Sequence, residues 1–251
     1  MISPREWRRV LAATAALLAL TSAPYLYAYL TQPPGLVYTG LLLNPLDGAT
    51  YFAKMQQGLN GQWLFTLPYT AQPGQGAFLF TYYLFLGHLC RWTGLAVPLV
   101  YHAARVAGGA ALLVSLYVFF ARFFDLPRQR FFGWMLAAVG SGFGWLATLF
   151  GLCTADLWVA EAFPFLSLTA SAHFAWAGAA QLWVILAAVD FSPSSQPAPH
   201  ALQPRRRNAA LLAATTVLGL IQPFALLSTG LVLAGWAAIQ TSNFKFQTSN
   251  S

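Results

Sequence analysis

The chain has 251 residues, is 58% hydrophobic but only 8% charged, and carries a formal net charge of +7. A soluble domain has about a quarter charged residues, so this composition excludes an ordinary soluble protein and indicates a helical protein that crosses a membrane several times. The arginines form short clusters between apolar runs, a pattern that marks membrane topology and predicts no nucleic-acid partner.

The first predicted element is a membrane span over residues 9–30, long enough to cross about 30 Å of hydrocarbon. Arg5, Arg8 and Arg9 precede it and predict a cytoplasmic N-terminus. Residues 31–97 are too polar, and too often interrupted by Pro and Gly, to span. We expect them to form an extracytoplasmic loop that contains interfacial helices.

The rest of the chain predicts four more spans, connected by loops that obey the positive-inside rule. The predicted spans cover residues 98–121, 131–151, 173–189 and 209–239. A break at 222–223 leaves the last either as one kinked span or as two short ones, because Pro223 removes a backbone hydrogen bond.

The connections complete the predicted organisation. Residues 192–207, "SPSSQPAPHALQPRRR", predict a flexible cytoplasmic linker, and residues 241–251 predict a polar tail. The sequence therefore predicts an all-α fold: a polytopic transmembrane helical bundle, with residues 1–240 as a single membrane domain.

The stretch "NPLDGATYFAKMQQG" places one of only six acidic residues, Asp47, just before a helix expected over 48–57. Asp47 is well placed as the N-cap of that helix, with Gly58 at its C-terminal end. The same carboxylate would stay ionised and suit a general base if a cavity lay beside it. Tyr51 and Lys54 share its helix face and are candidate substrate-binding residues.

A second expected outside loop contains Asp156 and Glu161, and His173 begins the following span. These carboxylates are candidate catalytic groups and could bind a divalent cation such as Mg or Mn, with the His173 imidazole as a further substrate contact. The spacing is not diagnostic. Solvated loop charges, and a histidine bonded to a neighbouring carbonyl, explain the same residues.

The motif "VYHAAR" places His102 and Arg105 three residues apart on one helix face. An arginine binds phosphate through its bidentate fork, so both residues are candidate substrate contacts. The alternative is that Arg105 extends along the helix to the lipid headgroups.

The order of these features resembles the GT-C integral-membrane glycosyltransferases, in particular an uncharacterised bacterial branch. The resemblance rests on Asp47 with Tyr51, on Gly61 with Trp63, and on Gln222-Pro223-Phe224, which departs from the family pattern at its first residue. Such enzymes generally have more spans, so the resemblance also implies that this chain is a fragment, a truncated form or a reduced relative without activity.

The resemblance implies an enzyme of the bacterial cytoplasmic membrane that transfers a sugar from a polyprenyl-phosphate donor to an acceptor at the extracytoplasmic face. It assigns catalytic roles to Asp47 first, and then to Asp156 and Glu161. Two alternatives stay open: a non-catalytic or truncated membrane protein, and a transporter subunit. The sugar, the acceptor and any protein partners are not indicated by the sequence.

Overall fold

The structure is a computed structural model that describes residues 2–189 and 203–249. It confirms the predicted all-α class. The helices are α1 Pro4–Leu30, α2 Pro45–Leu59, α3 Thr81–Thr93, α4 Val97–Phe123, α5 Pro127–Val139, α6 Gly144–Thr148, α7 Pro164–Thr169, α8 Ala172–Val189, α9 Pro204–Ile221 and α10 Pro223–Ser249, with short 3-10 turns η1 Ala155–Leu157 and η2 Ala160–Ala162. Residues 190–202, most of the predicted linker, lie outside the described residues.

The protein is a multi-pass membrane protein by the length and composition of its helices. Within the described residues, five segments are long and apolar enough to cross a bilayer. They are Pro4–Leu30, Val97–Phe123, Pro127–Thr148, Ala172–Val189 and Pro223–Gln240.

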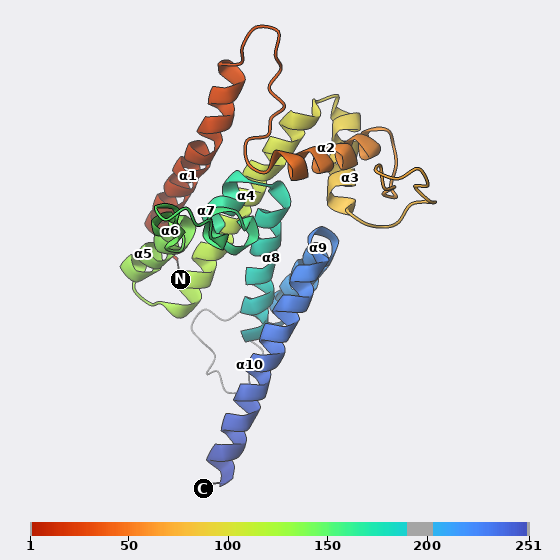
Figure 1. Cartoon of the computed structure of the whole chain (residues 1–251). Coiled ribbons are helices and arrows are strands. Elements are labelled where there is room, and N and C mark those ends of the chain that lie inside the picture. The colour runs from red at the N-terminus through yellow and green to blue at the C-terminus, as the bar shows by residue number, and fades with distance from the viewer. Residues whose placement is uncertain (1, 190–202, 250–251) are drawn as a thin grey trace.

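Helix α4 is the scaffold of the bundle, because it packs against helices on every side (Figure 1). A large apolar cluster joins it to α1, α5, α7 and α8 around the fully buried Trp134 and Tyr117. A second cluster, around Met55 and Tyr101, joins it to α2 and α3. A third, around Ala180 and Leu218, joins α8 to the α9–α10 pair. Burial of these apolar faces holds the elements in place.

The predicted span over 131–151 is interrupted. Helix α5 ends at Val139, and α6 begins only at Gly144. The connecting sequence is "GSGF", and its first residue, Gly140, adopts an extended conformation (φ −65°, ψ 139°). Glycine in a helix interior costs about 1 kcal/mol relative to alanine, which explains why the helix stops here.

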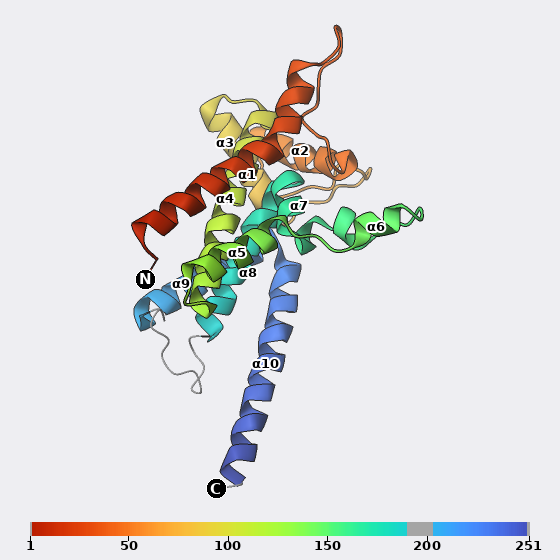
Figure 2. The same ribbon diagram turned by 90° about the vertical axis from the view of Figure 1, so that its left-hand side faces the viewer.

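The last apolar block forms two helices and not one kinked span. Helix α9 ends at Ile221, and α10 begins with Pro223, which cannot donate the hydrogen bond that a continuous helix needs. The two helices diverge from this turn, and α10 runs well past the end of α8 (Figure 2). Because α10 continues to Ser249, residues 241–249 of the predicted tail have a helical backbone.

Helices α2 and α3 cross at unusually close range through two glycines. A Cβ atom on Gly58 would lie 2.0 Å from the Leu84 carbonyl oxygen, and one on Gly87 would lie 2.0 Å from the Met55 carbonyl oxygen. The prediction that Gly58 ends the helix was wrong, since α2 continues through it to Leu59. Gly58 is needed for the crossing, because a side chain at this position would meet the backbone of α3.

Candidate functional site

Two adjoining cavities open beside the first turn of α2, and Asp47 and Phe174 line both of them. The first, here the Glu161 cavity, has a volume of about 550 Å³ and lies against η1, η2 and the α7–α8 connection. The second, here the Lys54 cavity, has a volume of about 620 Å³ and lies between α2, the start of α3, the start of α8 and the α9–α10 turn. Asp47 therefore lies where the two cavities meet.

Asp47 belongs to the first turn of α2 and is not its N-cap. The helix begins at Pro45, three residues earlier than expected, because proline is well suited to the first helical position. Asn44 precedes it in a left-handed conformation (φ 47°), and its side-chain amide donates a hydrogen bond of 2.5 Å to Asp47 Oδ2. The predicted capping role was thus wrong, while the carboxylate is exposed to both cavities.

Lys54 lies two turns further along α2, on the same face as Asp47. It is buried, with 9% of its surface exposed. Its Nζ atom lies 3.8 Å from the centre of the Phe80 ring and 4.9 Å from that of Tyr51. Burial lowers the pKa of Lys54, and the Asp47 carboxylate partly offsets this effect. Within the described part of the chain, the ammonium group has ring contacts but no hydrogen bond and no ion pair.

His173, in the first turn of α8, faces the same cavity. Its Nδ1 atom lies 2.7 Å from the hydroxyl oxygen of Tyr83, a buried residue of α3. The alternative interpretation, a bond to a neighbouring carbonyl, is therefore replaced by a contact between residues 90 positions apart.

Tyr51 connects the two sides of the Lys54 cavity. Its ring stacks on Tyr83, with centres 4.5 Å apart and planes 8° apart, and lies edge-on to His173 at 5.0 Å. Burial raises the pKa of Tyr51, and the charge of Asp47 raises it further, so the phenol stays protonated. We therefore interpret Tyr51 as a wall of the cavity and not as an acid or base.

The two predicted acids of the second loop have different surroundings. Glu161 is exposed and lines the Glu161 cavity together with Asp47. Asp156 is buried and lines neither cavity. Its carboxylate accepts hydrogen bonds from the Gly144 amide, at 2.7 Å, and from the Thr154 hydroxyl, and these bonds lower the pKa of Asp156. Asp156 thus fastens η1 to the start of α6.

A divalent cation needs several oxygen or nitrogen donors that converge on one point. Among residues 2–189 and 203–249, no group of three or more His, Cys, Asp or Glu side chains is placed to hold a metal ion. The Asp156 carboxylate is occupied by its hydrogen bonds to Gly144 and Thr154 and lines neither cavity. The Asp156–Glu161 metal site and its cation therefore stay predictions.

His102 and Arg105 lie outside both cavities, in a buried junction between α1, α4 and α7. Arg105 is 1% exposed and donates to the Leu168 carbonyl at 2.6 Å, to Ser22 Oγ at 2.9 Å and to His102 Nδ1 at 3.2 Å. His102 Nε2 lies 2.8 Å from the Gly40 carbonyl oxygen. The burial of Arg105 contradicts the alternative that it reaches the headgroups, and its donors already have protein partners.

The same junction satisfies the C-terminal end of α7. Three consecutive carbonyls, those of Leu168, Thr169 and Ala170, accept hydrogen bonds from Arg105, Tyr25 and Tyr101 respectively. The last carbonyls of a helix have no partners within it, so side chains of α1 and α4 replace those partners here. This fixes the chain immediately before Ser171 and His173, which line the cavities.

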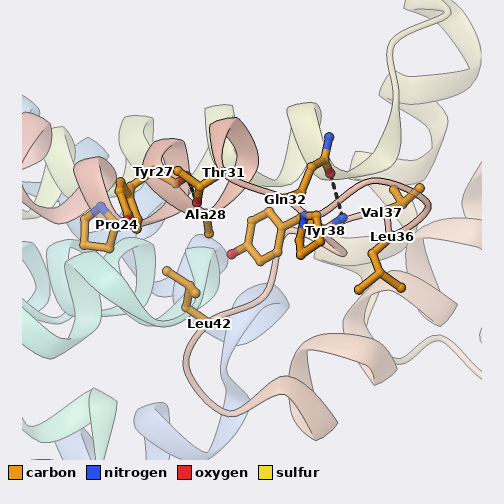
Figure 3. Close-up of a pocket in the computed structure, with 10 residues that line it drawn as sticks. Pro24, Tyr27, Ala28, Thr31, Gln32, Leu36, Val37, Tyr38 and Leu42 are labelled. Atoms are coloured by element: carbon orange, nitrogen blue, oxygen red, sulfur yellow. Dashed lines mark hydrogen bonds between the residues drawn. The ribbon is translucent and has the colours of Figure 1, made fainter.

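A third cavity, of about 590 Å³, lies between the end of α1 and the loop that follows it (Figure 3). Most of its lining is apolar, with Pro24, Leu36 and Leu42 among the residues drawn. The loop is held by the Tyr38 amide, which donates to Gln32 Oε1 at 2.9 Å, while the buried Tyr38 hydroxyl has no partner within the described residues. None of the predicted site residues lies here.

Tyr83 and the α9–α10 turn are the parts of the site that sequence reasoning missed. Tyr83 lies in the apolar stretch "TYYLFLGH" and carries no local signal of a polar role. The Gln222-Pro223 break was predicted, but not its position against α3, where the Thr81 hydroxyl donates to the Leu220 carbonyl at 3.2 Å.

No protein-family model, curated protein or solved structure matches the chain.

Proposed function

We propose that the protein is a membrane glycosyltransferase that moves a sugar from a polyprenyl-phosphate donor to an acceptor hydroxyl. The observation that carries the proposal is the position of Asp47 where two cavities meet. It shares one cavity with Glu161 and the other with Lys54 and His173. A transfer reaction needs two substrates on either side of a base, and this arrangement supports it.

The proposed reaction is a displacement at the anomeric carbon of the sugar. The acceptor oxygen forms a bond to that carbon while the bond from the carbon to the phosphate oxygen breaks, and the phosphate leaves with the bonding electron pair. The proton of the acceptor hydroxyl goes to the Asp47 carboxylate, which acts as a general base. The Lys54 ammonium lies on the donor side and balances the charge that develops on the leaving phosphate.

We further propose that the site faces outward from a bacterial cytoplasmic membrane, with the N-terminus in the cytoplasm. Arg5, Arg8 and Arg9 lie in the first turns of α1, Arg122 and Arg128 lie where α4 is followed by α5, and Arg205 to Arg207 begin α9. Clusters of this kind stay on the cytoplasmic side. The Lys54 cavity lies at the opposite end of α9 from its arginines, and the Glu161 cavity is lined in part by the loop after α1.

The test is sugar transfer from a polyprenyl-phosphate sugar by the full chain reconstituted in vesicles. We expect Asp47→Asn to reduce turnover by about 100-fold or more, because removal of a general base typically costs 10²–10⁴-fold. Asp125→Asn, which changes an exposed aspartate between α4 and α5, is the matched control and should leave turnover unchanged. Transfer that is absent from the unchanged chain, or equal in Asp47→Asn, would contradict the proposal.

A further inference from the structure

The Lys54 cavity contains a cationic group that forms no ion pair in the described residues, although the Asp47 carboxylate lines the same cavity. Residue Lys54 is nine-tenths buried, and its ammonium group lies over the rings of Phe80 and Tyr51 and has no hydrogen bond within the described part of the chain. A buried charge that lacks hydrogen-bond partners is costly. A phosphoryl oxygen in the cavity would provide the acceptor that the protein does not, through a charge-assisted hydrogen bond.

His173 presents a second donor to the same cavity. The Tyr83 hydroxyl has no other acceptor in the described residues, so its proton points to His173 Nδ1 at 2.7 Å. A neutral imidazole whose Nδ1 accepts a hydrogen bond carries its own proton on Nε2. His173 Nε2 has no hydrogen-bond partner in the described residues, but it is not fully buried. It is therefore open to the cavity that His173 lines.

The two donors lie around one aromatic ring. Tyr51 is 4.9 Å from Lys54 Nζ and 5.0 Å from the His173 ring, measured to its own ring centre. Asp47, on the rim of the cavity, is the facing carboxylate and repels an anion. An anionic group is therefore favoured on the side of Lys54 and His173, away from the Glu161 cavity.

We propose that Lys54 Nζ and His173 Nε2–H form a two-point site for a phosphoryl group, and that Tyr83 is the positioning residue that fixes the His173 tautomer. The choice of a phosphoryl group rests on the proposed function. The positions of the two donors do not depend on the proposed function. Phosphate binding can therefore be measured whether or not sugar transfer is found.

The tautomer is tested by nitrogen NMR of the ¹⁵N-histidine-labelled full chain, with the His173 signals assigned by their loss in His173→Gln. We expect the Nε2–H tautomer to dominate, and Tyr83→Phe to produce a mixture of both tautomers while it keeps the ring stacked on Tyr51. Tyr38→Phe is the matched control, because its buried hydroxyl has no hydrogen-bond partner in the described residues and lines a different cavity, and it should change nothing. The same tautomer ratio in Tyr83→Phe and the unchanged chain would overturn the positioning role.

Binding is tested on the same labelled chain in neutral detergent by titration with inorganic phosphate and, separately, with dodecyl phosphate. We expect a saturable shift of the His173 signals, about tenfold or more weaker in Lys54→Gln and retained in Lys54→Arg, since a charged donor strengthens the hydrogen bond. Arg91→Gln, at an exposed arginine of α3, is the control for general charge effects and should bind as the unchanged chain does.

The two probes distinguish the source of the phosphate. A response to dodecyl phosphate alone supports a site for a lipid-borne phosphate, and a response to inorganic phosphate supports a site for the group itself. No response to either probe, or a response that Lys54→Gln leaves intact, overturns the two-point site. If phosphate binds but Asp47→Asn does not affect transfer, the proposed function fails while the site stands.

Discussion

Arg105 and Lys54 are both buried cations without a carboxylate partner in the described residues, but their surroundings are opposite. Arg105 lies in the α1–α4–α7 junction, where two oxygen atoms and a ring nitrogen accept its hydrogen bonds. Lys54 lies in a cavity, where its ammonium group has ring contacts with Phe80 and Tyr51 but, within the described residues, no hydrogen bond. Burial of a charge alone therefore does not mark a binding site. The distinction lies in whether the protein itself supplies the acceptors.

The structural role of Arg105 can be tested by removing its charge and its hydrogen bonds. We expect Arg105→Met to destabilise the protein by about 3 kcal/mol, because it leaves the Leu168 carbonyl and its other partners buried without a donor. Arg105→Lys should restore little, since one ammonium group cannot reproduce the planar fork. Denaturant unfolding in detergent micelles measures both, and wild-type stability in Arg105→Met would show that the junction is not structural.

A change at the α2–α3 crossing should affect the Lys54 region alone. Gly87→Ala places a methyl group 2.0 Å from the Met55 carbonyl oxygen, so the helices must move apart, at a cost of about 1–3 kcal/mol. We expect weaker phosphate binding as well. Gly230→Ala, at a helical glycine with open space around it, is the control, and equal unfolding midpoints for the two variants would contradict the close crossing.

Lys54→Met should have a small effect on stability, opposite in sign to that of Arg105→Met. The variant removes a buried charge that has no acceptor, so we expect the unfolding free energy to stay the same or rise by about 1 kcal/mol, while the His173 response to phosphate is lost. A large loss of stability would mean that Lys54, like Arg105, has a structural role.

The smallest effect is expected at Asp156, which shares its loop with Glu161 but has a structural role. Its hydrogen bonds lower its pKa in the folded state, so their contribution to stability is present above the ordinary aspartate pKa of about 3.9 and is lost as the pH falls through the lower folded value. Thermal unfolding of Asp156→Asn should show a slightly reduced midpoint at neutral pH and no difference in strong acid. A difference that persists in acid would contradict this origin.

The sequence predicted the helical class and the break at Gln222-Pro223, because long apolar runs and a proline act locally. It placed the start of α2 three residues too late, since Pro45 was read as preceding the helix and not as its first residue. It also expected Gly58 to end the helix, whereas the residue allows the crossing with α3. A close contact between two helices leaves no signal within either one.

The candidate site was predicted only where its residues are close together in the sequence. Asp47, Tyr51 and Lys54 were grouped correctly on α2, because i, i+4 and i+7 positions share a helix face. The contact of Tyr83 with His173 and the burial of Arg105 depend on residues more than sixty positions apart. Charge and spacing do not reveal which arginine or lysine finds a carbonyl at such a distance.

The α9–α10 turn has a consequence for the order in which the protein is made. Residues 219–224 form one wall of the Lys54 cavity, and the Thr81–Leu220 hydrogen bond joins segments 139 positions apart. During synthesis, α2, α3 and α8 leave the ribosome well before this wall exists. Until the turn arrives, Lys54 and His173 stay accessible to water, so completion of the cavity is a late step of biogenesis that depends on a long-range contact.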